Sequence, residues 1–203
     1  MVLPAGRAHA QVTATAPVTI QPQYNYRWDV YGGAQYSHFN PSPGRNIEAT
    51  NLLGWTGETT LYFRPVWGLQ ADVRGLYGTM AVPQNSYNIP SNPKMSEYLF
   101  LFGPTFRLLK RENFAAGMHF LIGAAYGSFD KDFPQGVQPN VVNIYNNKLA
   151  FGSAVGWWTD FNLSPKLAIR AIADYQPTHY GYTTQNEFAG SVGIVYKFGV
   201  LRK

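Results

Sequence analysis

The chain has 203 residues, the length of a single domain, and it has no cysteine, which excludes a disulfide framework and a thiolate metal site. It is rich in aromatic residues, with 14 Tyr, 13 Phe and 5 Trp, and no run approaches the ~18 apolar residues of a membrane-spanning helix. The formal net charge of +5 is modest. No basic stripe with interleaved aromatics lies on one face, so a nucleic-acid partner is not expected.

The first residues resemble a processing site followed by a linker. Residues 1–10 end in Ala8-His9-Ala10, the small-x-small pattern of a secretory cleavage site before Gln11, although no apolar segment precedes it. We interpret residues 1–10 as the remnant of a signal peptide; a chance match is the alternative. Residues 11–23 contain Thr, Pro and Gln without a sustained period, which predicts a flexible lead-in.

Residues 24–199 repeat one pattern of alternating apolar and polar side chains. It is clearest in the last run, residues 187–199, where Val192, Ile194 and Tyr196 share one parity and small or polar residues share the other. A period of two predicts a β-strand with two chemically different faces. We expect eight such strands, over residues 24–39, 52–64, 67–81, 96–110, 114–128, 148–161, 166–175 and 187–199.

The connections between these strands alternate between long and short. This alternation is typical of an up-and-down meander in which one end of a barrel has tight turns and the other has long loops. An even number of strands places both termini at the short-turn end, which is periplasmic in bacterial outer-membrane barrels. The predicted fold is therefore an all-β, eight-stranded antiparallel transmembrane barrel over residues 24–199, with short periplasmic turns, four longer extracellular loops and a short basic tail, residues 200–203.

The polar faces of the predicted strands hold six positive and six negative side chains. Charges collected in a narrow lumen of low dielectric must be paired, because an isolated buried ion costs several kcal/mol. Eight strands enclose a lumen just wide enough for side chains to fill it. We therefore expect a lumen plugged by ion pairs, with no open pore and with His119 as an interior histidine. The expected network is Arg27, Asp29, Glu58, Arg64, Asp72, Arg74, Glu97, Arg107, Asp160, Arg170, Asp174 and Lys197.

The other faces are apolar and aromatic, as expected of a wall in contact with lipid. The side chains predicted to face the membrane are Trp28, Trp55, Phe63, Trp67, Tyr98, Phe100, Phe102, Phe120, Trp157, Tyr196 and Phe198. The turns and tail at the periplasmic end are basic, which suits either simple solvation or contact with anionic lipid. Their charged residues are Lys110, Arg111, Lys166, Arg202 and Lys203, with Glu112 as the opposing acid.

Four segments of the chain resemble the OmpA/OmpX-like superfamily of eight-stranded outer-membrane barrels, particularly small barrel proteins of acidobacterial type. They are VYGGAQYSHF (residues 30–39), YLFLFGPTFR (98–107), LAIRAIADYQPTHY (167–180) and QNEFAGSVGIVYKFG (185–199). The resemblance implies an integral protein of a Gram-negative outer membrane. Phe198 matches the terminal aromatic residue of such barrels, but five residues follow it. No peptidoglycan-binding domain follows the barrel, so an anchoring role is not implied.

The sequence contains no catalytic or metal-binding motif, and we expect no enzyme activity, no cofactor and no metal. One alternative is a lipid-modifying barrel enzyme with its site at the loop end, near His38, His179, Asp130 and Asp132. That alternative requires His38 or His179 within hydrogen-bonding reach of a Ser or Asp. A second alternative is a soluble lipocalin-like barrel that binds a small apolar ligand, but its lumen is apolar and its exterior polar.

We therefore expect an integral outer-membrane protein with a structural or surface-interaction role. The expected partners are membrane lipids, including an outer leaflet of lipopolysaccharide type, and a protein bound at the extracellular loops or within a larger envelope assembly.

Overall fold

The computed structural model describes residues 24–42 and 47–201. The predicted signal-peptide remnant, the lead-in over residues 11–23, and Arg202 and Lys203 lie outside this range. Within it, the regular elements are β1 (Trp28–Phe39), β2 (Thr50–Tyr62), β3 (Trp67–Thr79), β4 (Lys94–Lys110), β5 (Phe114–Ser128), the 3-10 helix η1 (Pro139–Val142), β6 (Lys148–Asn162), β7 (Leu167–Tyr175), β8 (Thr178–His179) and β9 (Phe188–Phe198).

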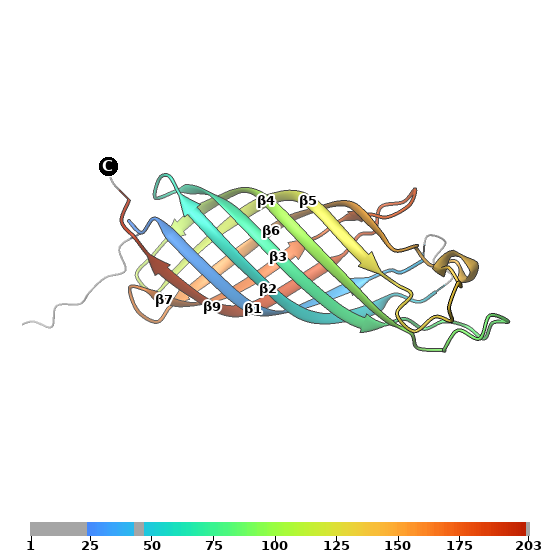
Figure 1. The fold of residues 1–203 in the computed structure, drawn as a ribbon. Coiled ribbons are helices and arrows are strands. Elements are labelled where there is room, and N and C mark those ends of the chain that lie inside the picture. The colour runs from blue at the N-terminus through green and yellow to red at the C-terminus, as the bar shows by residue number, and fades with distance from the viewer. Residues whose placement is uncertain (1–23, 43–46, 202–203) are drawn as a thin grey trace, which may run out of the picture.

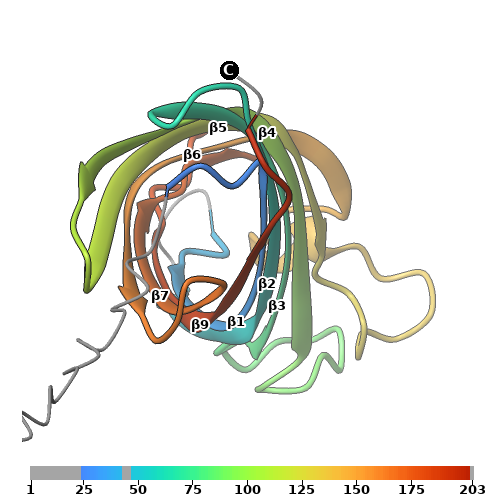
Figure 2. The ribbon, with the colours of Figure 1, turned by 90° about the vertical axis from the view of Figure 1, so that its left-hand side faces the viewer.

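Eight long antiparallel strands close into a barrel, which confirms the predicted fold class (Figures 1 and 2). Each long strand pairs with its neighbours in the chain, and β1 closes the ring by pairing with β9, so that Trp28 lies opposite both Leu61 and Phe198. The two-residue strand β8 pairs with β6 at Phe151 and Gly152, just beyond the end of β7. Among the described residues, no helix is long and apolar enough to cross a membrane.

The two ends of the barrel differ, as the alternating connections predict. The turns 63–66, 111–113 and 163–166 lie at one end, here called the short-turn end, where β1 begins and β9 ends (Figure 1). The connections 40–49, 80–93, 129–147 and 176–187 lie at the other, the long-loop end.

Alternation decides which side chains enter the lumen. In β9, Phe188, Val192 and Ile194 point outward and are 66%, 59% and 59% exposed, whereas Val195 and Lys197 are buried. The same parity holds in the other strands, because side chains alternate between the two faces of a sheet. The outer wall is therefore apolar, and the charged side chains of the strands point into the lumen except near the strand ends.

The first predicted strand begins too early. β1 starts at Trp28, and the preceding segment leaves the wall: the Leu201 amide donates to the Asn25 carbonyl, and Tyr26 is buried although its parity predicted an outward position. Residues 24–27 therefore continue the sequence alternation of β1, but their backbone does not continue the strand. Figure 2 looks into the barrel from this short-turn end.

The part of the lumen nearest the long-loop end is apolar, a feature that the prediction of a lumen plugged by ion pairs did not include. Lumen-facing side chains of the strands meet apolar residues of the long connections and form one buried cluster. This cluster includes Phe39, Leu52, Leu76, Leu99, Leu101 and Leu121 from the strands and Ile47, Met80, Val82, Ile89, Phe129, Ile144, Tyr145 and Tyr180 from the connections. The long connections thus fold onto the mouth of the barrel.

Candidate functional site

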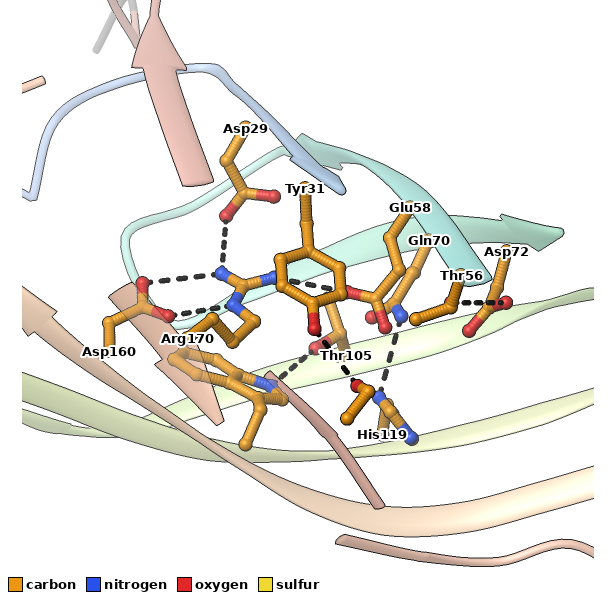
Figure 3. Close-up of polar contacts among 12 residues, drawn as sticks. Asp29, Tyr31, Thr56, Glu58, Gln70, Asp72, Thr105, His119, Asp160 and Arg170 are labelled. Atoms are coloured by element: carbon orange, nitrogen blue, oxygen red, sulfur yellow. Dashed lines mark hydrogen bonds and ion pairs between the residues drawn. The ribbon is translucent and has the colours of Figure 1, made fainter. Parts of the chain in front are cut away.

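Arg170 of β7 is the centre of the first charged cluster in the lumen (Figure 3). Its guanidinium is 3.0 Å from Asp29 Oδ2, 3.1 Å from Glu58 Oε2 and 2.7 Å from Asp160 Oδ1. The side chain of Trp158 lies against it, with the ring centroid 4.7 Å from the Arg170 Cζ. One cation thus joins carboxylates from three other strands, because its planar fork presents five donors.

Arg74 of β3 is the centre of a second cluster. Its Nη2 atom is 2.7 Å from Asp72 Oδ2 and 2.7 Å from Asp174 Oδ2. His119 Nε2 is 2.9 Å from Asp174 Oδ1, while its Nδ1 lies 3.4 Å from Gln70 Nε2. These contacts connect opposite walls of the barrel and leave His119 as a buried member of a polar network.

Arg107 closes the lumen at the short-turn end without a carboxylate partner among the described residues. The rings of Tyr62 and Tyr26 lie 4.0 and 4.4 Å from its guanidinium carbon. Its Nη1 donates to the Pro65 carbonyl at 3.1 Å, and its Nη2 donates to the Tyr26 hydroxyl. Aromatic faces and neutral acceptors therefore hold this cation, consistent with the attraction of cations to aromatic rings.

A fourth arrangement lies between the Arg74 cluster and the apolar mouth. Glu97 of β4 and Glu187, the residue before β9, are both fully buried and lie within hydrogen-bonding reach of each other. Thr178, Ser37 and Gln176 donate to Glu187. Burial raises the pKa of Glu187 well above its usual range, and the neighbouring Glu97 raises it further.

Tyr180, in the connection between β8 and β9, completes this arrangement. Its hydroxyl donates to Glu97 Oε1 at 2.9 Å. Burial and the two nearby carboxyl groups raise the pKa of the Tyr180 phenol, so it remains a donor.

The structure buries the charged residues predicted for the lumen, with two exceptions. Arg27 precedes β1 and Arg64 follows β2, and both are exposed at the short-turn end. Both share the parity of the lumen-facing residues of their strands, but the strands end before reaching them, so the parity no longer applies. The prediction for Arg27 and Arg64 is therefore wrong.

The predicted charge balance also changes. Among the described residues, the buried acids Asp29, Glu58, Asp72, Glu97, Asp160, Asp174 and Glu187 outnumber the buried bases Arg74, Arg107, Arg170 and Lys197. Several carboxylate oxygens, on Asp29, Glu58 and Glu97, have no hydrogen-bond donor. The buried bases therefore do not match the buried acids one for one.

Sequence reasoning missed several residues of the network. Glu187 and Gln176 fell outside the charge list, although each lies two residues from a lumen-facing position of its strand, Ala189 and Asp174. Trp158 was recognised as falling on the polar side, and its indole donates to Thr105 Oγ1 at 3.1 Å. Glu187 lay inside the predicted last strand, 187–199, on the parity of Ala189, and one more residue on the seventh predicted strand would have included Gln176 on the parity of Asp174.

Two glycines, Gly117 and Gly156, make room for the network. A Cβ on Gly156 would lie 1.7 Å from Asp174 Oδ1, and a Cβ on Gly117 would lie 2.4 Å from the Trp158 ring. Larger residues at these positions would displace lumen side chains.

The aromatic residues predicted to face the membrane all lie on the outside of the barrel or on its rim. Trp28 and Tyr98 are partly exposed, and the others are exposed; these are Trp55, Phe63, Trp67, Phe100, Phe102, Phe120, Trp157, Tyr196 and Phe198.

The geometry required by the lipid-modifying alternative is not found between residues 24 and 42 or 47 and 201. His38 Nδ1 lies 2.9 Å from Asn51 Oδ1, and His179 Nδ1 lies 2.9 Å from Thr184 Oγ1; neither histidine contacts a Ser or Asp there. The same ranges contain no group of three or more His, Cys, Asp or Glu residues placed to hold a metal ion.

A closed antiparallel barrel of eight long strands, with an apolar wall, a charged lumen and tight turns at one end, defines the class of small outer-membrane β-barrels. No family model matches the sequence, and no curated protein matches it. Solved structures do match the fold.

The neisserial surface protein NspA superposes with a TM-score of 0.59 at 12% identity, covering 84% of this chain and 97% of that one. Ail of Yersinia pestis gives 0.56 at 18% identity, covering 86% and 99%. OprG of Pseudomonas aeruginosa gives 0.54 at 12% identity, covering 87% and 98%. The chain thus has the fold of these eight-stranded outer-membrane barrels, which confirms the fold that the resemblance to the OmpA/OmpX-like superfamily implied; the acidobacterial type stays a prediction.

Proposed function

We propose that the chain is an integral outer-membrane protein with a closed lumen and a structural or surface-interaction role. The observation that supports this proposal is the placement of apolar side chains on the outside of the barrel and of charged side chains in its lumen. Apolar side chains such as Leu53, Ile122 and Phe151 are 65%, 63% and 56% exposed on the wall, while Arg74, Arg107 and Arg170 are buried. A soluble lipocalin-like barrel has the opposite arrangement, because its ligand occupies an apolar lumen.

The packing of the lumen supports a role without a pore. The largest fully buried side chains include Trp158, Arg74, Arg107 and Arg170, all directed inward from the strands. The three arginines occupy successive positions along the barrel, and the apolar cluster occupies the end nearest the long connections.

The charge of the short-turn end supports a periplasmic orientation. Its described part exposes Arg27, Arg64, Lys110, Arg111 and Lys166, with Glu112 as the opposing acid. Outward aromatic residues such as Trp67 and Phe198 lie beside this basic rim and suit the membrane interface. Basic residues at headgroup depth attract anionic lipid, so this end fits against the phospholipid of an inner leaflet.

The long-loop end is the candidate interaction face. Tyr182 is fully exposed there and lines a surface hollow together with Asn140, Asn146 and Lys148. An aromatic ring beside amides and one cation suits polar ligands such as the sugar headgroups of a lipopolysaccharide-type leaflet. One structure of Ail, with a TM-score of 0.51 and 17% identity, contains the heparin analogue sucrose octasulfate.

Heat-modifiability on a detergent gel tests the proposed membrane barrel. The chain refolded in micelles should migrate differently before and after boiling, because a closed barrel resists detergent until it is heated. Unchanged migration together with solubility of the folded chain in plain buffer would contradict the proposal and favour the soluble ligand-binding barrel.

A further inference from the structure

Glu97 and Glu187 form an acid pair that spans the lumen. Glu97 comes from β4 and Glu187 from the start of β9, and in the sheet order three strands, β1 to β3, separate β4 from β9. Both side chains are 0% exposed. Neither takes part in an ion pair among the described residues, in contrast to Asp72, Asp160 and Asp174, whose carboxylates contact arginine.

The hydrogen bonds of the acid pair leave one carboxylate oxygen without a donor. Glu187 accepts from Thr178 at 2.8 Å, from Ser37 at 3.1 Å and from Gln176 at 3.1 Å. Glu97 Oε1 accepts from Tyr180 at 2.9 Å, but its Oε2 atom is buried without a donor. A buried acceptor without a donor is unfavourable, and more so when it is charged.

No cation among residues 24–42 and 47–201 pairs with the carboxyl groups of the acid pair. Opposite Glu97 in the sheet are Leu76 of β3 and Gly127 of β5, and the pair is covered by the apolar cluster on its outer side. The only titratable group that contacts it from the connection 176–187 is Tyr180. Arg74 reaches it indirectly, since Arg74 Nη1 donates to Gln176 Oε1. The other polar groups of that layer are engaged elsewhere: Asp72 and Asp174 contact Arg74, and His119 contacts Asp174.

We propose that Glu97 and Glu187 share one proton, and that this proton-binding site holds the connection 176–187 in the mouth of the barrel. A proton on one carboxyl group gives the other a donor and removes one of two adjacent negative charges. Gln176 and Thr178 donate to Glu187 and brace the connection internally, while Tyr180 donates to Glu97 of β4 and Ser37 of β1 donates to Glu187, so the acid pair ties the connection to two strands of the wall. Its opening is therefore coupled to loss of the proton.

The direction of the pH dependence follows from the geometry. An unfolded glutamate titrates near pH ~4.3. A folded pair that retains a proton to higher pH contributes stability that is fully present below this value and is lost as the pH rises through the folded pKa. Release of one proton on opening changes the equilibrium constant by up to about tenfold per pH unit.

The test compares the refolded full chain with Glu97→Gln and Glu187→Gln in urea titrations between about pH 5 and pH 8. In either variant an amide donates to the remaining carboxylate at every pH. The unfolding equilibrium constant of the wild type should rise relative to either variant, by up to about tenfold per pH unit. Glu48→Gln, an exposed acid at the same end, is the matched control and should follow the wild type.

Two measurements on the wild type keep the test independent of the variants. The infrared carbonyl band of a protonated carboxylic acid should be present near neutral pH, and hydrogen exchange in residues 176–187, corrected for intrinsic rates, should accelerate as this band disappears. Parallel stability curves for all four proteins, or absence of the band, would overturn the proposal. Stability that depends on sodium in place of choline at equal ionic strength would also overturn it, in favour of a bound cation.

Discussion

Arg170 forms ion pairs with three buried carboxylates in the lumen. It contacts Asp29, Glu58 and Asp160, all buried. Asp160 also lies 3.2 Å from Lys197 Nζ, whereas Asp29 and Glu58 pair with no other cation among the described residues. A buried pair contributes little net stability relative to an apolar replacement of the whole pair. Removal of one partner is different, because the other charges stay buried without compensation.

Arg170→Met should therefore lower the free energy of unfolding by about 3–5 kcal/mol, because Asp29 and Glu58 lose the cation that they contact and Asp160 keeps only Lys197. The measurement is urea unfolding of the refolded chain in lipid vesicles near neutral pH. Arg64→Met provides the matched control, since Arg64 is exposed in a turn, and it should change stability by no more than about 0.5 kcal/mol. Equal, small effects for both variants would show that Arg170 does not hold the network together.

At the scale of elements, β9 carries the clearest signal for the orientation of the wall. Ile194 lies in the middle of the strand and Phe198 at its end, and both point outward with 59% and 40% exposure. The cost of a charge on a lipid-facing wall depends on depth, from about 2–4 kcal/mol for Arg at the midplane to about 0–1 kcal/mol near the interface.

Ile194→Arg should therefore destabilise the refolded barrel by about 2–4 kcal/mol in vesicles, and Phe198→Arg by no more than about 1 kcal/mol beyond its lost packing. Chemical denaturation in vesicles measures both variants under the same conditions. On a wall in water, neither substitution would place a charge in hydrocarbon, and the difference between the two would vanish.

The strands could be predicted because alternation is a local property. β5 begins and ends at the predicted residues, and the outward parity of β9 follows directly from its sequence. The ends of strands are less predictable: Arg27 and Arg64 continue the alternation after the strand geometry has ended. Leu99 and Leu101 interrupted the alternation of β4, and the structure explains this, because the connections bring apolar side chains such as Met80 and Phe129 to the same layer. Those connections have no period, so their folding onto the mouth left no sequence signal.

At the scale of the whole molecule, each surface of the barrel has a different type of side chain. Apolar residues cover the outer wall, charged clusters fill the lumen, a basic rim surrounds the short-turn end, and polar connections cover the long-loop end. The central claim is that the wall contacts lipid while the lumen contacts neither lipid nor bulk water.

The tryptophans give the most direct test, because two neighbours in β6 face opposite ways. Trp157 points outward with 42% exposure, and Trp158 is 1% exposed in the lumen against Arg170. Single-tryptophan variants, with the other tryptophans replaced by Phe, are refolded into vesicles whose acyl chains carry bromine, a contact quencher of indole fluorescence. Trp157 should be quenched by the lipid and Trp158 by neither the lipid nor aqueous iodide. Quenching of Trp157 by iodide but not by brominated lipid would contradict the account, because the outer wall would then lie in water.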